Sequence, residues 1–240
     1  MSKPQLIVAL DVDTFQQAKA LVDQLDDAVK IFKVGSQLFT AYGPFVTRYL
    51  QAKGKKVFLD LKFHDIPNTV ASAVKSAVSL SVAPGKEKNF APLYMLTIHT
   101  SGGREMMEAA VSAAKEQSKK LKVKRPLLVG VTVLTSEAKD GKLQALVLDR
   151  AMVARRAGLD GVVASVEEAP LIRRYCPKDF LIVTPGIRPA GADAGDQKRA
   201  ATPKAAIISG SDFLVVGRPI VQVQNPLKAA KAILKEISGG

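Results

Sequence analysis

Residues 57–70 read VFLDLKFHDIPNTV, and this stretch contains the structural unit from which the fold can be predicted. An apolar run, 57–59, stops at Asp60, and further charged residues lead to Pro67, where helical spacing begins. Proline suits the first turn of a helix, because a backbone N–H at that position would have no partner within the helix. The stretch therefore predicts a buried strand, a charged junction and then a helix.

The same unit recurs along the whole chain. Apolar runs of strand length alternate with stretches rich in Ala, Lys, Gln and Leu that have helical spacing, and the runs are 5–10, 31–35, 56–60, 94–99, 127–134, 161–165, 181–186 and 213–217. Strands that are apolar throughout are typical of a parallel sheet covered by helices. Eight such units predict a (β/α)₈ TIM barrel that forms a single domain over residues 1–240, with a doubly wound open sheet as the competing fold.

The composition is that of an ordinary globular protein, with 47% hydrophobic and 24% charged residues. No apolar run reaches the roughly 18 residues that a membrane-spanning helix needs. The first apolar run stops at Asp11, which is too early for a signal peptide. The single Cys176 excludes an intrachain disulfide, and no Cys/His spacing of the zinc-binding type is present. A reducing, cytoplasmic location is the simplest interpretation, and Cys176 is expected to be inert.

The formal net charge of +13 has three interpretations: a nucleic-acid binder, a protein that handles small anions, or a lysine-rich surface. The densest basic stretch is KEQSKKLKVKR, from Lys115 to Arg125. It contains no aromatic residue on which bases would stack. We therefore interpret it as a solvated helix end and loop.

Polar residues gather where the predicted strands end. In a barrel, these ends meet at the C-terminal mouth, where catalytic residues lie. The residues at or just after these ends are Asp11, Lys33, Asp60, Lys62, His99, Thr135, Ser136, Ser165, Arg188 and Arg218. Any one of them has a structural explanation, such as a helix N-cap. Together they predict a pocket with two acids, two lysines and two arginines.

Two details refine this pocket. Asp60 and Lys62 are two residues apart in one strand, so they are expected to face the same side as a contacting pair, although an ion pair that merely closes the barrel is the structural alternative. Asp65 lies on the loop, where the two-residue period of a strand does not predict which way its side chain points. TPGIRP (184–189) and VVGRPI (215–220) each place Gly and Arg directly after a strand, which predicts a phosphate site after strands seven and eight.

These residues resemble the family of orotidine 5′-monophosphate decarboxylases in its bacterial form. The resemblance covers nearly the whole chain, in order. The matching motifs are ALD at 9–11, FKVG at 32–35, LDLKFHDIPNTV at 59–70, HTSGG at 99–103, VTVLTS at 131–136, VTPGIRP at 183–189, DQKRAATP at 196–203 and VVGRPI at 215–220.

The resemblance implies a (β/α)₈ homodimer with active sites at the dimer interface, which decarboxylates orotidylate to uridylate without a metal or organic cofactor. It implies a charged network of Lys33, Asp60 and Lys62 with Asp65 from the partner subunit, in which Lys62 delivers the proton that replaces the carboxylate. The substrate-binding residues that it implies are Asp11 and Lys33 for the ribose with Thr69 from the partner subunit, Thr135 and Ser136 for the pyrimidine, and Arg188, Gln197, Gly217 and Arg218 for the phosphate.

Two other functions stay open at this point. A related barrel lyase that acts on a keto-sugar phosphate with Mg²⁺ needs a second acid beside Asp60, whereas this chain has Lys33 there, and a cation repels a metal ion. A barrel that binds nucleic acid through its lysines would not need the intact charged site, so nucleic acid is not an expected partner.

We expect His64 to pack or cap near the site; His99 is either an interior histidine or a site residue. The long loop 81–92 is expected at the N-terminal end of the barrel, and loop 189–199 is the candidate lid.

Overall fold

A computed structural model describes residues 4–25, 27–85, 90–133, 143–189 and 201–239 of the chain. Its centre is a closed barrel in which neighbouring strands are parallel and run in chain order. The strands are β1 (Gln5–Ala9), β2 (Ile31–Gly35), β3 (Lys56–Phe63), β4 (Leu93–His99), β5 (Leu127–Val131), β6 (Gly161–Val163), β7 (Leu181–Thr184) and β8 (Phe213–Val216). Because β1 pairs with both β2 and β8, the sheet has no edge. The predicted TIM barrel is confirmed, and the open sheet is excluded.

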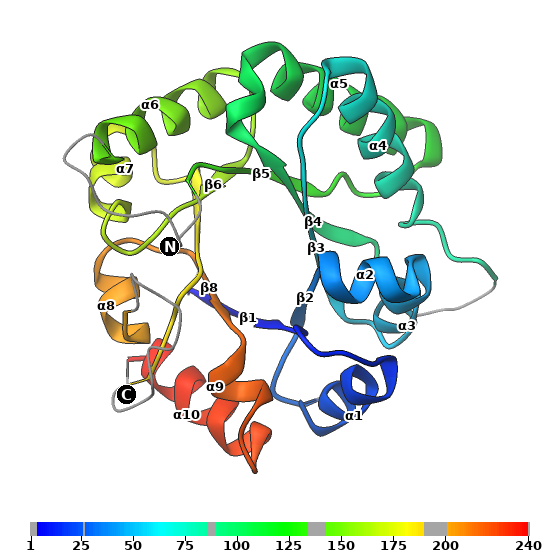
Figure 1. Cartoon of the computed structure of the whole chain (residues 1–240), viewed down its shortest axis with the longest axis vertical. Helices are drawn as coiled ribbons and strands as arrows, with labels where there is room; N and C mark the ends of the chain where they lie inside the picture. The colour runs from blue at the N-terminus through cyan, green and yellow to red at the C-terminus, as the bar shows by residue number, and fades with distance from the viewer. Residues whose placement is uncertain (1–3, 26, 86–89, 134–142, 190–200, 240) are drawn as a thin grey trace.

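Helices surround the barrel on the outside (Figure 1). They are α1 (Phe15–Leu25), α2 (Ser36–Tyr42), α3 (Pro44–Ala52), α4 (Pro67–Ser79), the 3₁₀ turn η1 (Thr100–Gly102), α5 (Gly103–Leu121), α6 (Leu143–Arg156), α7 (Ala169–Tyr175), α8 (Pro203–Ile208), α9 (Arg218–Val221) and α10 (Pro226–Ile237). Helix α4 begins at Pro67, as the sequence predicts. None of the helices in the described ranges is long and apolar enough to cross a membrane.

The buried apolar side chains form two layers. One cluster lies between the strands and the helices, and a smaller cluster fills the barrel interior. The interior cluster includes Ile7, Ile31, Phe58, Met95 and Phe213. This division follows from the alternation of side chains along each strand, and it explains why every strand is apolar on both faces.

The observed strands differ from the predicted ones mainly at their C-terminal ends. Strand β3 continues past Asp60 to Phe63, whereas β5 stops at Val131 and β6 at Val163. The prediction that β3 ends at Asp60 is wrong, because the strand pairs with β4 again at Phe63, beyond the charged residues.

Two surface predictions have clear outcomes. Helix α5 ends at Leu121, and the lysines of the basic stretch, from Lys115 to Lys124, are exposed, so this stretch is the solvated helix end and loop that we expected. Loop 81–92 lies between α4 and the start of β4, at the N-terminal end of the barrel, as expected. There the Gln51 side chain donates to the carbonyls of Leu80 (3.0 Å) and Ala91 (2.9 Å). Residues 86–89 of this loop lie outside the described residues.

Candidate active site

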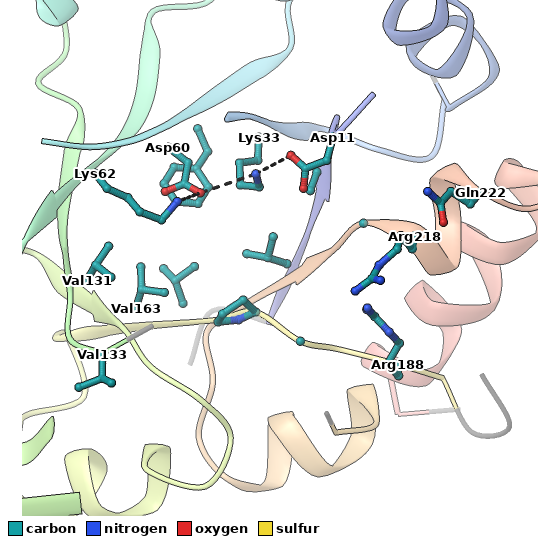
Figure 2. A pocket seen from close by; sticks show the side chains of 17 residues that line it. Asp11, Lys33, Asp60, Lys62, Val131, Val133, Val163, Arg188, Arg218 and Gln222 are labelled. Carbon is teal, nitrogen blue, oxygen red and sulfur yellow. Dashed lines mark hydrogen bonds and ion pairs between the residues drawn. The ribbon is translucent and has the colours of Figure 1, made fainter. Parts of the chain in front are cut away.

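A cavity of about 420 Å³ opens at the C-terminal mouth of the barrel. This volume lies in the range of small-molecule binding sites. Seven of the residues predicted from the sequence line it, namely Asp11, Lys33, Asp60, Lys62, Arg188, Gly217 and Arg218. Figure 2 shows that the charged side chains occupy two separate sides of this cavity.

On one side, four side chains of alternating charge form a row. Lys33 Nζ lies 2.9 Å from Asp11 Oδ1 and 3.6 Å from Asp60 Oδ2. Lys62 Nζ lies 2.9 Å from the same Asp60 oxygen. The Lys33 and Asp60 side chains are only 11% and 12% exposed, so solvent screens this part of the row weakly. Each charge has a neighbour of opposite sign, which offsets the free-energy cost of removing it from water.

The expected contact between Asp60 and Lys62 is present, but the strand around it is not regular. Leu59 pairs with Leu96 and Phe63 with Ile98, so three residues of β3 face a single residue of β4. Within this bulge, Lys62 has a left-handed backbone with φ of 51°. A residue with a side chain adopts this conformation at a cost of about 1–2 kcal/mol. The strand period therefore predicted the correct contact between Asp60 and Lys62, although the backbone there is a bulge and not a regular strand.

Thr97, the residue of β4 opposite the bulge, was not predicted as part of the site. Its hydroxyl accepts a hydrogen bond from the Lys62 backbone N–H (2.8 Å) and donates one to Asp60 Oδ1 (3.0 Å). Thr97 is fully buried. The sequence gives no signal for this role, because Thr97 stands inside an apolar run and its partners depend on the register between two strands.

Two arginines lie on the other side of the cavity. Arg188 follows β7, and Arg218 is the first residue of α9, directly after β8 and Gly217. Their guanidinium groups point toward one another across a small space (Figure 2). The Arg188 backbone N–H donates to the Ala201 carbonyl (2.8 Å), and the Ala201 N–H donates to the Gly186 carbonyl (3.2 Å), so the backbone of this segment is fixed.

Two converging guanidinium groups repel each other and attract an anion between them. Guanidinium groups bind phosphate oxygens with paired hydrogen bonds, which suits this space to a phosphate group. Gln222, the residue directly after α9, also lines the cavity, and the sequence analysis missed it. Apolar side chains also line the cavity, and they include Val131, Val163 and Val215. The cavity is therefore suited to a phosphorylated molecule whose reacting part lies against the lysine and aspartate row.

Asp65 and Thr69 do not line the cavity of their own chain. Both residues are exposed, and Asp65 Oδ1 accepts a hydrogen bond from the Ile66 N–H (2.6 Å). The adjacent Ile66 is an exposed apolar residue, with 66% of its surface accessible. Thr135, Ser136 and Gln197 fall outside the described residues, as does most of the candidate lid.

The remaining polar residues at the strand ends have structural partners. The rings of His64 and His99 stack with centroids 5.2 Å apart, so His64 packs near the site as expected. His99 is half-buried, and its Nδ1 lies 2.5 Å from Ser101 Oγ. Just before α7, Glu168 Oε2 accepts from the Ser165 N–H (3.0 Å), and Ser165 Oγ accepts from the Glu167 N–H (3.3 Å).

The charged side chains of the cavity differ from those of a metal site. In the part of the chain that the structure describes, no group of three or more His, Cys, Asp or Glu side chains is placed to hold a metal ion. In the cavity, Lys33 Nζ lies between the carboxylates of Asp11 and Asp60. The ammonium group at this position would repel a divalent cation.

Comparisons with known proteins give matches over nearly the whole chain. The family model described as "Orotidine 5'-phosphate decarboxylase / HUMPS family" matches residues 4–233. The chain is 48% identical to the orotidine 5′-phosphate decarboxylase of Coxiella burnetii, over 98% of this chain and 97% of that protein. It is 47% identical to the enzyme of the same name from Vibrio cholerae, over 99% of this chain and 98% of that protein. The crystal structure of the orotidine 5′-phosphate decarboxylase from Lactobacillus acidophilus is similar with a TM-score of 0.81 and 36% identity, covering 98% of this chain and 99% of that one.

Proposed function

The chain belongs to the orotidine 5′-phosphate decarboxylase / HUMPS family, and we propose that it is a carboxy-lyase that converts orotidine 5′-monophosphate to uridine 5′-monophosphate and CO₂ in pyrimidine biosynthesis. We propose further that it needs no cofactor and that Lys62 protonates C6 of the pyrimidine. The observation that carries the proposal is the arrangement of the cavity, in which the row of Lys33, Asp60 and Lys62 lies opposite Arg188 and Arg218.

Substrate binding begins at the phosphate. Arg188 and Arg218 bind the phosphate group, with Gly217 and Gln197 as further contacts that the family resemblance implies. The ribose lies near Asp11 and Lys33, which are joined by a 2.9 Å hydrogen bond. Thr135 and Ser136 hold the pyrimidine. Phosphate binding far from C6 supplies binding energy that positions the ring against the charged row.

The chemical step breaks the bond between C6 and the carboxylate carbon. The electron pair stays on C6, CO₂ leaves, and a proton from Lys62 Nζ forms the new C6–H bond. The neutral amine of Lys62 then regains a proton from solvent. The carbanion at C6 is poorly delocalised, so preorganised positive charge beside C6 is the main means of lowering the barrier. Asp60, 2.9 Å from Lys62 Nζ, keeps the ammonium group in place.

The active enzyme is proposed to be a homodimer whose sites contain residues of both subunits. Asp65 and Thr69 face solvent beside the exposed Ile66, so these residues are free to meet a second copy of the chain. In the dimer, Asp65 of the partner subunit completes the alternating row beyond Lys62. A cytoplasmic location is proposed on the sequence features alone.

The first test is the loss of orotidylate absorbance with purified protein in a buffer that contains a chelator. We expect rapid conversion to uridylate. Replacing Lys62 with Ala lowers kcat at least 10³-fold, which is about the contribution of a positioned proton donor. Undiminished turnover of Lys62→Ala would exclude it as the proton donor. No turnover by the folded wild-type protein, with Mg²⁺-dependent activity on a keto-sugar phosphate, would favour the other activity of such barrels.

Shared sites are tested by subunit complementation. Lys62→Ala and Asp65→Ala are each nearly inactive alone. When the two variants are unfolded and refolded together in equal amounts, half of the dimers are mixed and one of their two sites is complete, so about a quarter of the wild-type activity returns. Sites built from one subunit would give no recovery.

A further inference from the structure

We propose that Thr97 is a positioning residue for the proton donor, and that its hydroxyl group sets the position of Lys62 at both ends of the lysine side chain. The proposal rests on the proposed decarboxylase function and extends it to a residue of β4 that is not among the residues lining the cavity. Two hydrogen bonds of Thr97 support it, one with the Lys62 backbone and one with the Asp60 carboxylate.

The first bond fixes the backbone of Lys62. In the bulge of β3, Asp60, Leu61 and Lys62 face only Thr97 of β4, so the regular ladder of backbone hydrogen bonds is interrupted there. The Lys62 N–H donates to Thr97 Oγ1 at 2.8 Å instead. A side-chain oxygen therefore takes the place of a strand carbonyl and holds the left-handed conformation of Lys62, whose φ is 51°.

The second bond fixes the group that holds the lysine ammonium. A threonine hydroxyl has one proton to donate, and here it goes to Asp60 Oδ1 at 3.0 Å. The other Asp60 oxygen, Oδ2, lies 2.9 Å from Lys62 Nζ and 3.6 Å from Lys33 Nζ. The carboxylate is thereby held in the orientation that keeps Oδ2 between the two lysines.

The two bonds close a ring that runs from the Lys62 backbone through Thr97 and Asp60 back to Lys62 Nζ. Thr97 is fully buried, so its hydroxyl makes these two bonds out of contact with bulk water. Removing the hydroxyl leaves the Lys62 N–H and Asp60 Oδ1 without this partner, and both ends of the lysine gain freedom. A displacement of about 1 Å at a reacting group lowers rates by up to about 100-fold.

The test compares four proteins: the wild type, Thr97→Val, Thr97→Ser and Thr100→Val. Valine keeps the shape of threonine without the hydroxyl, and serine keeps the hydroxyl. Thr100 is the matched control, since it is also buried and its hydroxyl donates to the Val131 carbonyl (2.8 Å) without contacting Asp60 or Lys62. Thr97→Ala is the second variant, with the same expectation, in case valine at position 97 prevents folding.

We expect Thr97→Val to lower kcat about 30- to 100-fold, as the loss of an outer-shell partner does in other sites. The KM for orotidylate stays within about threefold, because the arginines at the phosphate end are unaffected. Thr97→Ser restores kcat to within about threefold of wild type, and Thr100→Val keeps it within about twofold. Hydrogen–deuterium exchange of a peptide covering residues 60–65 becomes at least about tenfold faster in Thr97→Val but not in Thr97→Ser.

Equal activity of Thr97→Val and wild type overturns the proposal, and so does a serine variant as impaired as the valine variant. Unchanged exchange at residues 60–65 overturns it as well, because the lysine backbone would then be held by something else. If the wild type itself does not convert orotidylate, the proposed function is wrong. In that case the exchange difference between Thr97→Val and Thr97→Ser alone decides whether Thr97 positions Lys62.

Discussion

The two ends of the barrel both contain aspartates paired with cations, but they use different cations. At the N-terminal end, Arg125 holds Asp160 with two hydrogen bonds, of 2.6 and 2.9 Å, and Arg173 pairs with Asp212. At the C-terminal end, Asp60 lies between two lysines. Arginine is a rigid fork that does not release its proton, whereas lysine is a flexible point charge that does.

The backbone around these aspartates also differs between the two ends of the barrel. Asp160 also accepts from the Leu128 N–H (2.7 Å) and Asp212 from the Ile182 N–H (2.7 Å), so each carboxylate ties one strand to the next. Around Asp60 the strand is bulged, and Lys62 has a left-handed backbone. The N-terminal end is built for stability, and the C-terminal end gives up some stability to hold reactive groups.

The largest expected difference between the two ends is in kcat/KM for orotidylate. Arg218→Ala removes one of the two guanidinium groups at the proposed phosphate site, and we expect kcat/KM for orotidylate to fall about 100-fold, as the loss of a charged hydrogen-bonding group predicts. Arg125→Ala is the matched control, because it removes the same side chain from the opposite end of the barrel. Steady-state kinetics should show kcat/KM of Arg125→Ala within about twofold of wild type. Equal losses in the two variants would mean that the ends are not functionally separate.

The next effect is on stability. Asp160→Asn weakens the paired hydrogen bonds with Arg125 and leaves a half-buried guanidinium group without its counter-charge. We expect the free energy of unfolding to fall by about 2 kcal/mol and the Tm by about 4–8 °C, with kcat unchanged. Chemical denaturation and the orotidylate assay on the same preparation measure both quantities. A loss of activity below the melting transition would contradict the assignment of this end to stability.

A smaller effect tests the strain at the C-terminal end. Glycine adopts a left-handed backbone without the penalty that alanine incurs, so Lys62→Gly should be more stable than Lys62→Ala by about 0.5–1 kcal/mol, although both are inactive. Lys122, at the end of α5, is the matched control, since its φ of 55° is close to that of Lys62. The same pair of substitutions there should give the same sign with full activity. If alanine at position 62 is as stable as glycine, the bulge relaxes and the strain is not imposed by the barrel.

The prediction from sequence succeeded where the signal was local. The length and apolar composition of the runs predicted each strand, and the six charged residues and one glycine at or near the ends of those runs predicted seven residues of the cavity, including Asp11, Lys33 and Arg188. Strand order did not have to be guessed, because eight consecutive βα units close in chain order.

It failed where the structure depends on how one strand lies against the next. Thr97 and the bulge at Lys62 result from the register of β3 on β4, which no single strand reveals. The same reason hides Asp160 and Asp212, which stand just before their strands and look like ordinary turn residues. Gln222 was missed because it lies after the short helix α9 and not at a strand end.

The smallest effect concerns a surface cluster of one aspartate and two lysines. Asp23 of α1 lies 2.7 Å from both Lys19 and Lys53, and its hydrogen bonds to these lysines hold the pKa of the Asp23 carboxyl well below its usual range. A group with a lowered pKa in the folded state stabilises the protein above its unfolded pKa of about 3.8, and the stabilisation is lost as the pH falls below that value.

Because Asp23 and its two lysines are largely solvated, Asp23→Asn should lower the Tm at pH 7 by only about 1–2 °C. The difference from wild type should begin to shrink below about pH 4, where wild-type Asp23 starts to bind a proton. A Tm difference as large as that of Asp160→Asn would mean that helix-surface pairs stabilise this barrel as much as the aspartates that join its strands.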